Sequence, residues 1–245
     1  MNDRPIGFTG QMMRAILDDK KTQTRRVVKM RARSVQTGKM IDVPVYSVTK
    51  RMNEITEQFP TQYFSNDGCL HFCQGQAGDF PMWNNALSCP YGVPGDRLWM
   101  KEPWVTERRY DHLPPSKLPK AAKIWYLNDE GDIPEWRGRY RHSRFIPKRF
   151  ARINLEVTSV RVERVQDIEE GGAIVEGINY WSKSTTFNEN YQIVYENYEN
   201  PKEPFVGDAI SSFRTLWDLI NNLRGYGWDT NPWVWVVGFV RVNER

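Results

Sequence analysis

The chain has 245 residues and a formal net charge of +4; 40% of its residues are hydrophobic and 13% are aromatic. So much apolar side chain is enough for a packed core and argues against a largely disordered chain. Three cysteines do not make the disulfide framework of small secreted proteins, no apolar run reaches membrane-spanning length, and the first residues lack a hydrophobic signal segment. We therefore expect a cytoplasmic protein, whose modest positive charge permits nucleic-acid binding without requiring it.

The N-terminal pattern predicts a helix followed by a strand. Apolar residues recur at helical spacing after Thr9, which is a suitable N-cap, and the helix is expected to end near Asp18. Residues 22–29 contain several β-branched side chains, which favour an extended strand. Lys20 and Lys21 therefore fall at a helix-to-strand corner.

This corner contains a cluster of cations around a hydroxyl group. Lys20, Lys21, Arg25 and Arg26 lie within seven residues and surround Thr24. Neighbouring cations disfavour the protonated form of a lysine, and a partly neutral lysine beside a hydroxyl can act as a general base for nucleophilic attack. A regular strand would point Lys21 and Thr24 to opposite faces, so the two meet only at an irregular corner. The alternative is a solvated basic hairpin that contacts phosphates.

Three segments without sustained periodicity are interpreted as insertions: residues 30–88, 106–135 and 180–206. The first contains short alternating patches, and Pro44 restricts the strand there to a sheet edge, so we expect hairpins. The second is rich in proline and charge. The third is polar, rich in Asn and Tyr, and is expected to be a mobile loop.

One set of thiols and imidazoles allows a metal site. Cys69, His71 and Cys73, together with Cys89, supply the ligand types that zinc prefers. The C-x-H-x-C spacing is not a usual zinc motif, so buried or surface thiols are the favoured interpretation.

Residues 97–101 alternate as a strand does, after a segment dense in turn formers. Leu98 and Met100 would be buried on one face. Trp99 and Lys101 would share the other face and could line a binding groove in a small barrel. Equally, Trp99 could belong to the core and Lys101 could be solvated.

The segment 136–152 has no acidic residue and combines basic with aromatic side chains. Guanidinium groups neutralise phosphates and aromatic rings stack on unpaired bases, so this composition suits nucleic acid. The competing interpretation is a basic strand pair whose aromatic rings point into the core. The aromatic side chains are Trp136, Tyr140, Phe145 and Phe150, and the candidate nucleic-acid-binding cations are Arg144, Lys148 and Arg149.

Two strands, residues 152–157 and 160–165, are expected next, followed by a helix over residues 166–177. Asp167 is the expected N-cap and Gly177 the C-terminal stop. Glu176 falls in the last turn, where the helix dipole disfavours a carboxylate, and such a misplaced charge indicates either function or an ordinary exposed glutamate.

The C-terminal region predicts a helix and a final strand. Asp208 is the expected N-cap, Gly225 the stop, and an apolar stripe between them extends to Leu223. Residues 233–242 are apolar on both faces and predict a strand at the centre of a closed sheet. Many short strands with a few helices indicate an α+β fold.

Residues 16–26, I-L-D-D-K-K-T-Q-T-R-R, resemble the signature G-x-K-x-x-E-x-R of ASCH domains, relatives of the PUA domain. Lys21 and Arg26 stand at the family's Lys and Arg. Asp19 replaces the Gly and tolerates the left-handed conformation that a helix end needs. Thr24 replaces the Glu, as in the small ASCH amidohydrolases that deacetylate N4-acetylcytidine. The runs at 95–99, 150–158 and 231–237 resemble larger phage-encoded ASCH proteins.

This resemblance implies a single domain over residues 1–245, an ASCH/PUA-like β-barrel flanked by helices. It implies a nucleoside or nucleic-acid-directed hydrolase in which Lys21 is the base, Thr24 the nucleophile and Glu176 the proton relay. Arg26 would hold a phosphate or the substrate carbonyl, with Arg25 and Lys20 beside it. No cofactor or metal is expected. A non-catalytic module that binds RNA or a modified base, and a ribonuclease, remain the alternatives.

Overall fold

A computed structural model of the chain describes residues 1–33, 40–44, 62–64, 69–72, 87–129, 131, 133–184 and 191–242, and within 30–87 and 183–191 it describes the main chain only. Contacts group the chain into two compact units. Unit 1 comprises Met1–Asp19, Tyr91–Thr158 and Phe239–Arg245, and unit 2 comprises Lys20–Pro90 and Ser159–Gly238. The strands β11 (Asn154–Arg164) and β15 (Trp233–Val242) each begin in one unit and end in the other. The single domain with three insertions stays a prediction.

In unit 1 a small sheet is joined to a short helix and a hairpin. Strand β1 pairs in parallel with β8, which pairs antiparallel with the first part of β11, and β9 pairs antiparallel with β10. The elements are β1 (Asp3–Gly7), α1 (Gly10–Leu17), β8 (Arg97–Lys101), β9 (Trp104–Thr106), β10 (Ile124–Tyr126) and the 3-10 turns η1 (Arg108–Tyr110), η2 (Pro115–Lys117), η3 (Ser143–Phe145) and η4 (Lys148–Phe150).

The local predictions for unit 1 are confirmed. The Thr9 hydroxyl accepts a hydrogen bond of 3.4 Å from the main-chain N–H of Met12 and so caps α1. Asp19 adopts a left-handed φ of 56° directly after the helix, as its tolerance for that conformation predicts. In β8, Leu98 and Met100 are fully buried, with 0% exposed, while the alternate residues are half-buried.

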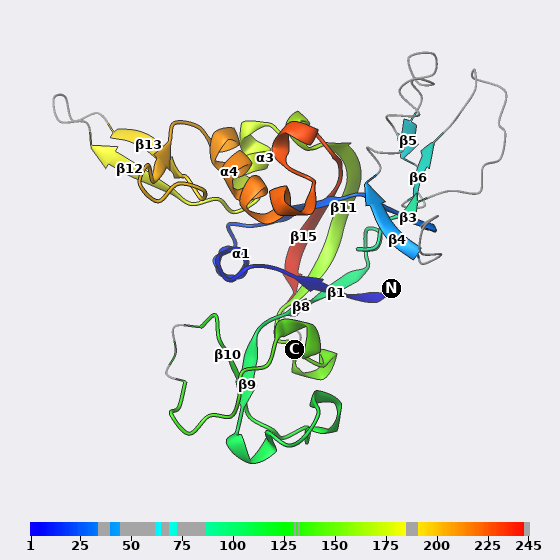
Figure 1. Ribbon diagram of the computed structural model, residues 1–245, viewed down its shortest axis with the longest axis vertical. Helices are drawn as coiled ribbons and strands as arrows, with labels where there is room; N and C mark the ends of the chain where they lie inside the picture. Colours follow the sequence, from blue (N-terminus) through cyan, green and yellow to red (C-terminus); the bar gives the residue numbers. More distant parts are fainter. Residues whose placement is uncertain are drawn as a thin grey trace. The chain divides into compact units, whose positions relative to one another are not determined.

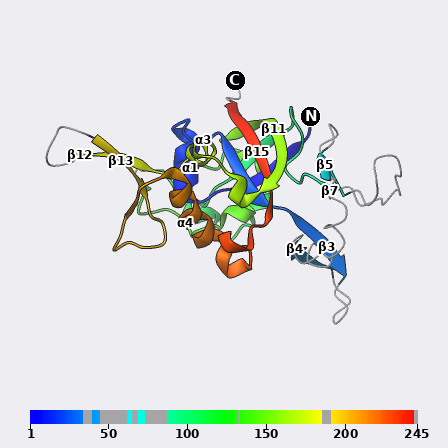
Figure 2. The same ribbon diagram turned by 90° about the horizontal axis from the view of Figure 1, so that it is seen from above.

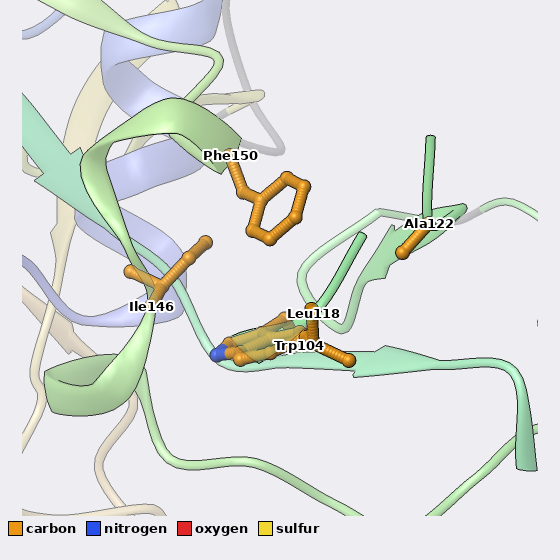
Figure 3. Close-up of a cluster of buried hydrophobic side chains, with 5 residues drawn as sticks. All are labelled: Trp104, Leu118, Ala122, Ile146 and Phe150. Carbon is orange, nitrogen blue, oxygen red and sulfur yellow. The ribbon is translucent and has the colours of Figure 1, made fainter. Parts of the chain in front are cut away.

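The predicted insertion at 106–135 contributes side chains to an apolar cluster of unit 1. Figure 3 shows five buried side chains of this cluster, which come from β9, the loop after it, and the η3–η4 segment: Trp104, Leu118, Ala122, Ile146 and Phe150. Arg141 is 5% exposed and its guanidinium lies 5.1 Å from the Trp104 ring centroid. It donates to the carbonyls of Leu113 and Tyr110 at 3.1 and 2.8 Å, which fastens the loop to the cluster.

Unit 2 combines a sheet with two helices. Strand β15 lies between β11 and β2, and its residues 234–237 are at most 2% exposed, so the predicted central position of this strand is confirmed. Helices α3 and α4 lie side by side in both views (Figures 1 and 2), and the Ala209 N–H donates to the Glu170 carboxylate at 3.1 Å. The elements are β2 (Gln23–Val27), β3 (Lys29–Arg33), β4 (Met40–Pro44), β5 (Gln62–Phe64), β6 (Cys69–Phe72), β7 (Leu87–Ser88), η5 (Val165–Asp167), α3 (Glu170–Val175), β12 (Tyr180–Ser184), β13 (Tyr191–Glu196), β14 (Phe205–Val206), α4 (Ala209–Asn221), η6 (Asn222–Arg224) and η7 (Trp228–Thr230).

The predicted hairpins within 30–88 are present among the described strands. Strand β3 pairs antiparallel with β4 (Figure 2), and β6 pairs antiparallel with both β5 and β7. The prediction of a mobile loop at 180–206 is wrong. That segment contains the antiparallel sheet β12–β13–β14 (Figure 1), with cross-strand ring pairs Tyr180–Tyr195 and Trp181–Phe205 at 6.1 and 5.5 Å. Tyr180 and Trp181 are neighbours on opposite faces and are 54% and 46% exposed, so neither face gives the apolar alternation of a half-buried strand.

Three boundary predictions are also corrected. The two strands predicted between residues 152 and 165 are one continuous strand, β11. Helix α3 begins only at Glu170, because the Asp167 carboxylate caps the preceding 3-10 turn through the Arg164 N–H at 3.0 Å; Gly177 ends the helix with φ 81° as predicted. The predicted apolar stripe of α4 fails at Leu223, which is 101% exposed in the following turn.

The α+β class is confirmed. The closed sheet expected around residues 233–242 is not found, because the sheets formed by the described strands are open. Within the described part of the chain, no helix is both long enough and apolar enough to cross a membrane.

Trp104→Ala should lower the free energy of unfolding by about 3–5 kcal/mol, because Trp104 has 0% of its surface exposed and fills the unit 1 cluster. Urea denaturation followed by circular dichroism measures this. Trp136→Ala is the matched control, since Trp136 is 58% exposed, and should change the stability by no more than about 0.5 kcal/mol. Equal losses in both variants would contradict the assignment of the cluster as the core of unit 1.

Candidate functional site

Lys21 and Glu176 meet in unit 2 although 155 residues separate them. The Lys21 Nζ donates to Oε2 of Glu176 and to its main-chain oxygen, both at 2.7 Å. Their side chains are 0% and 2% exposed. Lys21 lies just before β2 and Glu176 caps the C-terminal end of α3, and the Thr22 N–H donates to the Val175 carbonyl at 3.1 Å. The corner and the helix end are therefore joined by main-chain and side-chain contacts.

A charged network extends from this pair towards the surface. Arg25 Nη1 donates to Oε1 of Glu176 at 3.1 Å, and its Nε and Nη2 donate to Oε1 of Glu163 at 2.8 and 2.5 Å. Oε2 of Glu163 accepts from Arg161 Nε at 3.0 Å, and Arg161 Nη1 donates to the Gln23 side chain at 3.2 Å. Each carboxylate thus has a different cation on each oxygen.

Arg25, rather than Thr24, contacts the pair. Lys21, Gln23 and Arg25 all contact groups of the network, as expected for alternate residues of one extended segment. Thr24 is buried, with 2% exposed, and as the neighbour of Arg25 in a regular strand it belongs to the opposite face of β2. Its role as nucleophile stays a prediction.

Burial lowers the pKa of Lys21 from its ordinary value of 10.5, because the charged form loses its hydration. The Glu176 carboxylate opposes this effect through its charge and hydrogen bond, while Arg26 and Arg25 add to the lowering. Burial lowers the pKa of Lys21 more than the neighbouring cations do, although only the cations are visible in the sequence. Lys21 therefore releases its proton more readily than a solvated lysine does, as a general base must.

The other predicted binding residues near the corner and in β8 occupy different environments. Lys20 is exposed and Arg26 is half-buried. Trp99 and Lys101 are half-buried in unit 1, where the Lys101 ammonium lies 5.4 Å from the Trp99 ring centroid. This intramolecular contact lies on the face predicted to line a groove.

The aromatic side chains of segment 136–152 are largely exposed, contrary to the interpretation that they point into the core. Trp136, Tyr140 and Phe145 are 58%, 61% and 56% exposed, whereas Phe150 belongs to the unit 1 cluster. The Arg144 guanidinium is exposed and lies 5.3 Å from the Phe145 ring centroid. Exposed rings beside exposed guanidinium groups are the parts that a single-stranded nucleic-acid surface requires.

The predicted cations Lys148 and Arg149 have intramolecular partners. Lys148 forms an ion pair with Asp3. Arg149 Nη2 donates to the carbonyls of Pro115, Ser116 and Leu118 at 3.1, 3.2 and 3.1 Å. These contacts tie segments of unit 1 together.

The predicted zinc ligands cannot be placed, since the side chains of Cys69 and His71 and the whole of Cys73 lie outside the described residues. Cys89 is buried, with 3% exposed. Within the described residues, no three His, Cys, Asp or Glu side chains form a group that could hold a metal ion.

Comparison of the chain with protein-family models, with curated proteins and with solved structures finds no match.

The sequence did not reveal the contacts of four network members: Arg25, Glu163, Arg161 and Gln23. A signal for Glu163 exists in V-R-V-E-R at residues 160–164, where Arg161 and Glu163 occupy alternate positions of a strand and so share one face. Their distant partners, Arg25 and Gln23, come from β2, and a local pattern carries no information about such partners.

The free energy of unfolding should rise with pH, and the rise should depend on the presence of Lys21. Its pKa is lowered in the folded state, so between that pKa and the ordinary value near 10.5 the unfolded chain binds more protons, and raising the pH favours folding. Urea unfolding of the wild type and of Lys21→Met between pH 7 and pH 10 measures the difference. The wild type should gain stability relative to the variant, and parallel curves would contradict the lowered pKa.

Proposed function

We propose that the protein is a hydrolase of the ASCH type that acts on a nucleoside or nucleic acid, and that its substrate is an N4-acylated cytosine. The observation that carries the proposal is the buried Lys21–Glu176 contact of 2.7 Å. The ASCH resemblance pairs the same two residues across the sequence. The proposal includes an ASCH/PUA-like fold, for which the α+β architecture is suitable.

The chemistry follows from the lysine. A neutral Lys21 amine accepts the proton of the attacking hydroxyl, whose oxygen bonds to the acyl carbon. The bond between that carbon and N4 then breaks, and the leaving N4 takes the proton from Lys21. Glu176 orients Lys21 through its hydrogen bond of 2.7 Å and stabilises the ammonium while it exists. The products are the cytosine base and a carboxylic acid, with one water consumed.

Two hydroxyl sources fit this scheme. If Thr24 attacks, an acyl-threonine forms and a water later hydrolyses it. If water attacks directly, no acyl-enzyme forms. The alternation in β2 argues against Thr24, since it assigns Thr24 to the face opposite Arg25. Direct attack by water requires that substrate binding opens access to Lys21, whose side chain is 0% exposed. Thr24→Val removes turnover only in the first case.

Purified wild-type protein should convert N4-acetylcytidine to cytidine, as measured by chromatography. Lys21→Met should lower the rate by about 10²–10⁴-fold, the usual cost of losing a general base. A buried pair that loses one partner is also destabilised by about 3–5 kcal/mol, so the fold of each variant is checked by thermal melting.

Glu102→Gln is the matched control for this experiment. Glu102 is 0% exposed and is held by Arg152 at 3.1 and 2.8 Å, so this variant disturbs a buried ion pair that is absent from the Lys21 network. It should keep a rate close to that of the wild type. Turnover that survives in folded Lys21→Met, or that is missing from the wild type, would refute the hydrolase and leave the Lys21–Glu176 pair a structural one.

A second candidate function is binding of single-stranded RNA, favoured by the exposed rings of segment 136–152. Three aromatic side chains more than half exposed, with Arg144 beside one of them, match the way such proteins stack bases and neutralise phosphates. This function needs no turnover.

Trp136→Ala and Tyr140→Ala should each weaken binding of a fluorescent single-stranded RNA by about 1–3 kcal/mol, the usual contribution of one stacked base. Arg144→Gln should reduce the slope of log affinity against log salt by about one, because one phosphate contact is lost. Anisotropy titrations at several salt concentrations measure both. Trp181→Ala, an exposed tryptophan of unit 2, is the control, and equal losses in Trp181→Ala and Trp136→Ala would reject segment 136–152 as the binding surface.

A further inference from the structure

Both oxygens of the Glu176 carboxylate are held, and by different cations. Lys21 Nζ contacts Oε2 at 2.7 Å and Arg25 Nη1 contacts Oε1 at 3.1 Å. A carboxylate held on one oxygen can still rotate about its last torsion. The second contact restricts this rotation, so Arg25 contributes to the orientation of the oxygen that meets Lys21.

Arg25 is itself anchored from the other side. Its Nε and Nη2 contact one oxygen of Glu163 at 2.8 and 2.5 Å, and the other oxygen of Glu163 contacts Arg161. The exposed fraction of the side chain falls from 48% at Arg161 to 15% at Glu163 and 2% at Arg25. The network therefore leads from the surface of unit 2 to the buried lysine.

The guanidinium of Arg25 is closely packed by its surroundings. A Cβ placed on Gly172 of α3 would lie 3.2 Å from Arg25 Nη2, closer than ordinary van der Waals contact. The Phe213 ring centroid of α4 lies 5.8 Å from the Arg25 Cζ, within the range of a cation–π contact. Main-chain packing and an aromatic ring thus add to the two carboxylates in fixing the guanidinium.

We propose that Arg25 is a positioning residue for Lys21: it holds the Glu176 carboxylate in place and couples the charge of Glu163 to the lysine. The meaning of this coupling for catalysis rests on the proposed function, whereas the coupling itself does not.

The coupling of Arg25 and Glu163 to Lys21 is electrostatic. A guanidinium stays protonated throughout the working pH range, so Arg25 and Arg161 remain cations opposite the carboxylates Glu163 and Glu176. Among the described residues, the charges that act on Lys21 include Glu176 at the end of α3 and Arg25 and Arg26 in β2. Glu163 and Arg161 in β11 act on it through Arg25. Removing a cation from this group should favour the lysine proton, and removing an anion should disfavour it.

The test follows the Lys21 protonation midpoint by NMR, using side-chain carbon signals of labelled lysine with Lys21→Met to assign them. In Arg25→Gln the midpoint should rise, because a cation that lowers the lysine pKa is lost. In Glu163→Gln it should fall. In the double variant Arg25→Gln/Glu163→Gln it should return towards the wild-type value, since one cation and one anion have been removed together.

A merely structural role for Arg25 predicts a different pattern. Loss of packing would admit water to the site, and both single variants would then move the midpoint upwards, towards the ordinary lysine value. Shifts of the same sign, or none, overturn the proposal. If Arg25→Gln does not fold, Arg161→Gln replaces it, because that side chain is 48% exposed and its removal should give a smaller upward shift. A downward shift or no shift in Arg161→Gln overturns the proposal as well.

The same variants separate this proposal from the proposed function. If Lys21 is the base, the acidic limb of the pH profile of kcat/KM should move with the NMR midpoint in every variant. Midpoints that move as expected in a protein without turnover would support the positioning role and refute the hydrolase. Turnover whose pH profile is unaffected by either charge change would refute the positioning role and support the hydrolase.

Discussion

A buried charge without a partner is too costly for a folded protein, and this constraint organises the Lys21 site. Lys21 has no side-chain surface in contact with water, so its ammonium requires acceptors inside unit 2. Both contacts of 2.7 Å come from one residue, Glu176, through its carboxylate and its main-chain oxygen. The end of α3 must therefore stay next to the corner before β2. The Thr22 N–H bond to the Val175 carbonyl reinforces this arrangement.

Unit 1 also has buried carboxylates, and a comparison with one of them, Glu102, shows what is unusual about Lys21. Glu102 is fully buried, but its partner Arg152 is 29% exposed and also contacts Asp129 near the surface. An arginine keeps its proton under any ordinary condition, so that pair has one charge state. A lysine without water contact can lose its proton, which makes the Lys21–Glu176 pair suitable for proton transfer, whereas the Glu102–Arg152 pair stays charged.

Local rules predicted the elements whose signals are local. The cap at Thr9, the left-handed Asp19, the alternation of β8 and the apolar run of β15 depend on a few neighbouring residues each. The rules failed for β12–β13–β14, where ring pairs form across strands and residues on both faces are exposed, so no one-sided alternation marks the strands. They also failed at residues 158–159, where β11 continues through a polar pair that was interpreted as a break.

For the candidate site, the sequence by itself determined the residue types and, through the ASCH resemblance, the pair Lys21 and Glu176. Only the tertiary structure decided that the third member in contact is Arg25, because the face that a side chain occupies depends on where β2 begins and what packs over it. Burial was likewise decided by the fold. Four cations within seven residues suggest a solvated surface, yet Lys21 and Arg25 are buried, since α3 and β11 bring carboxylates to both.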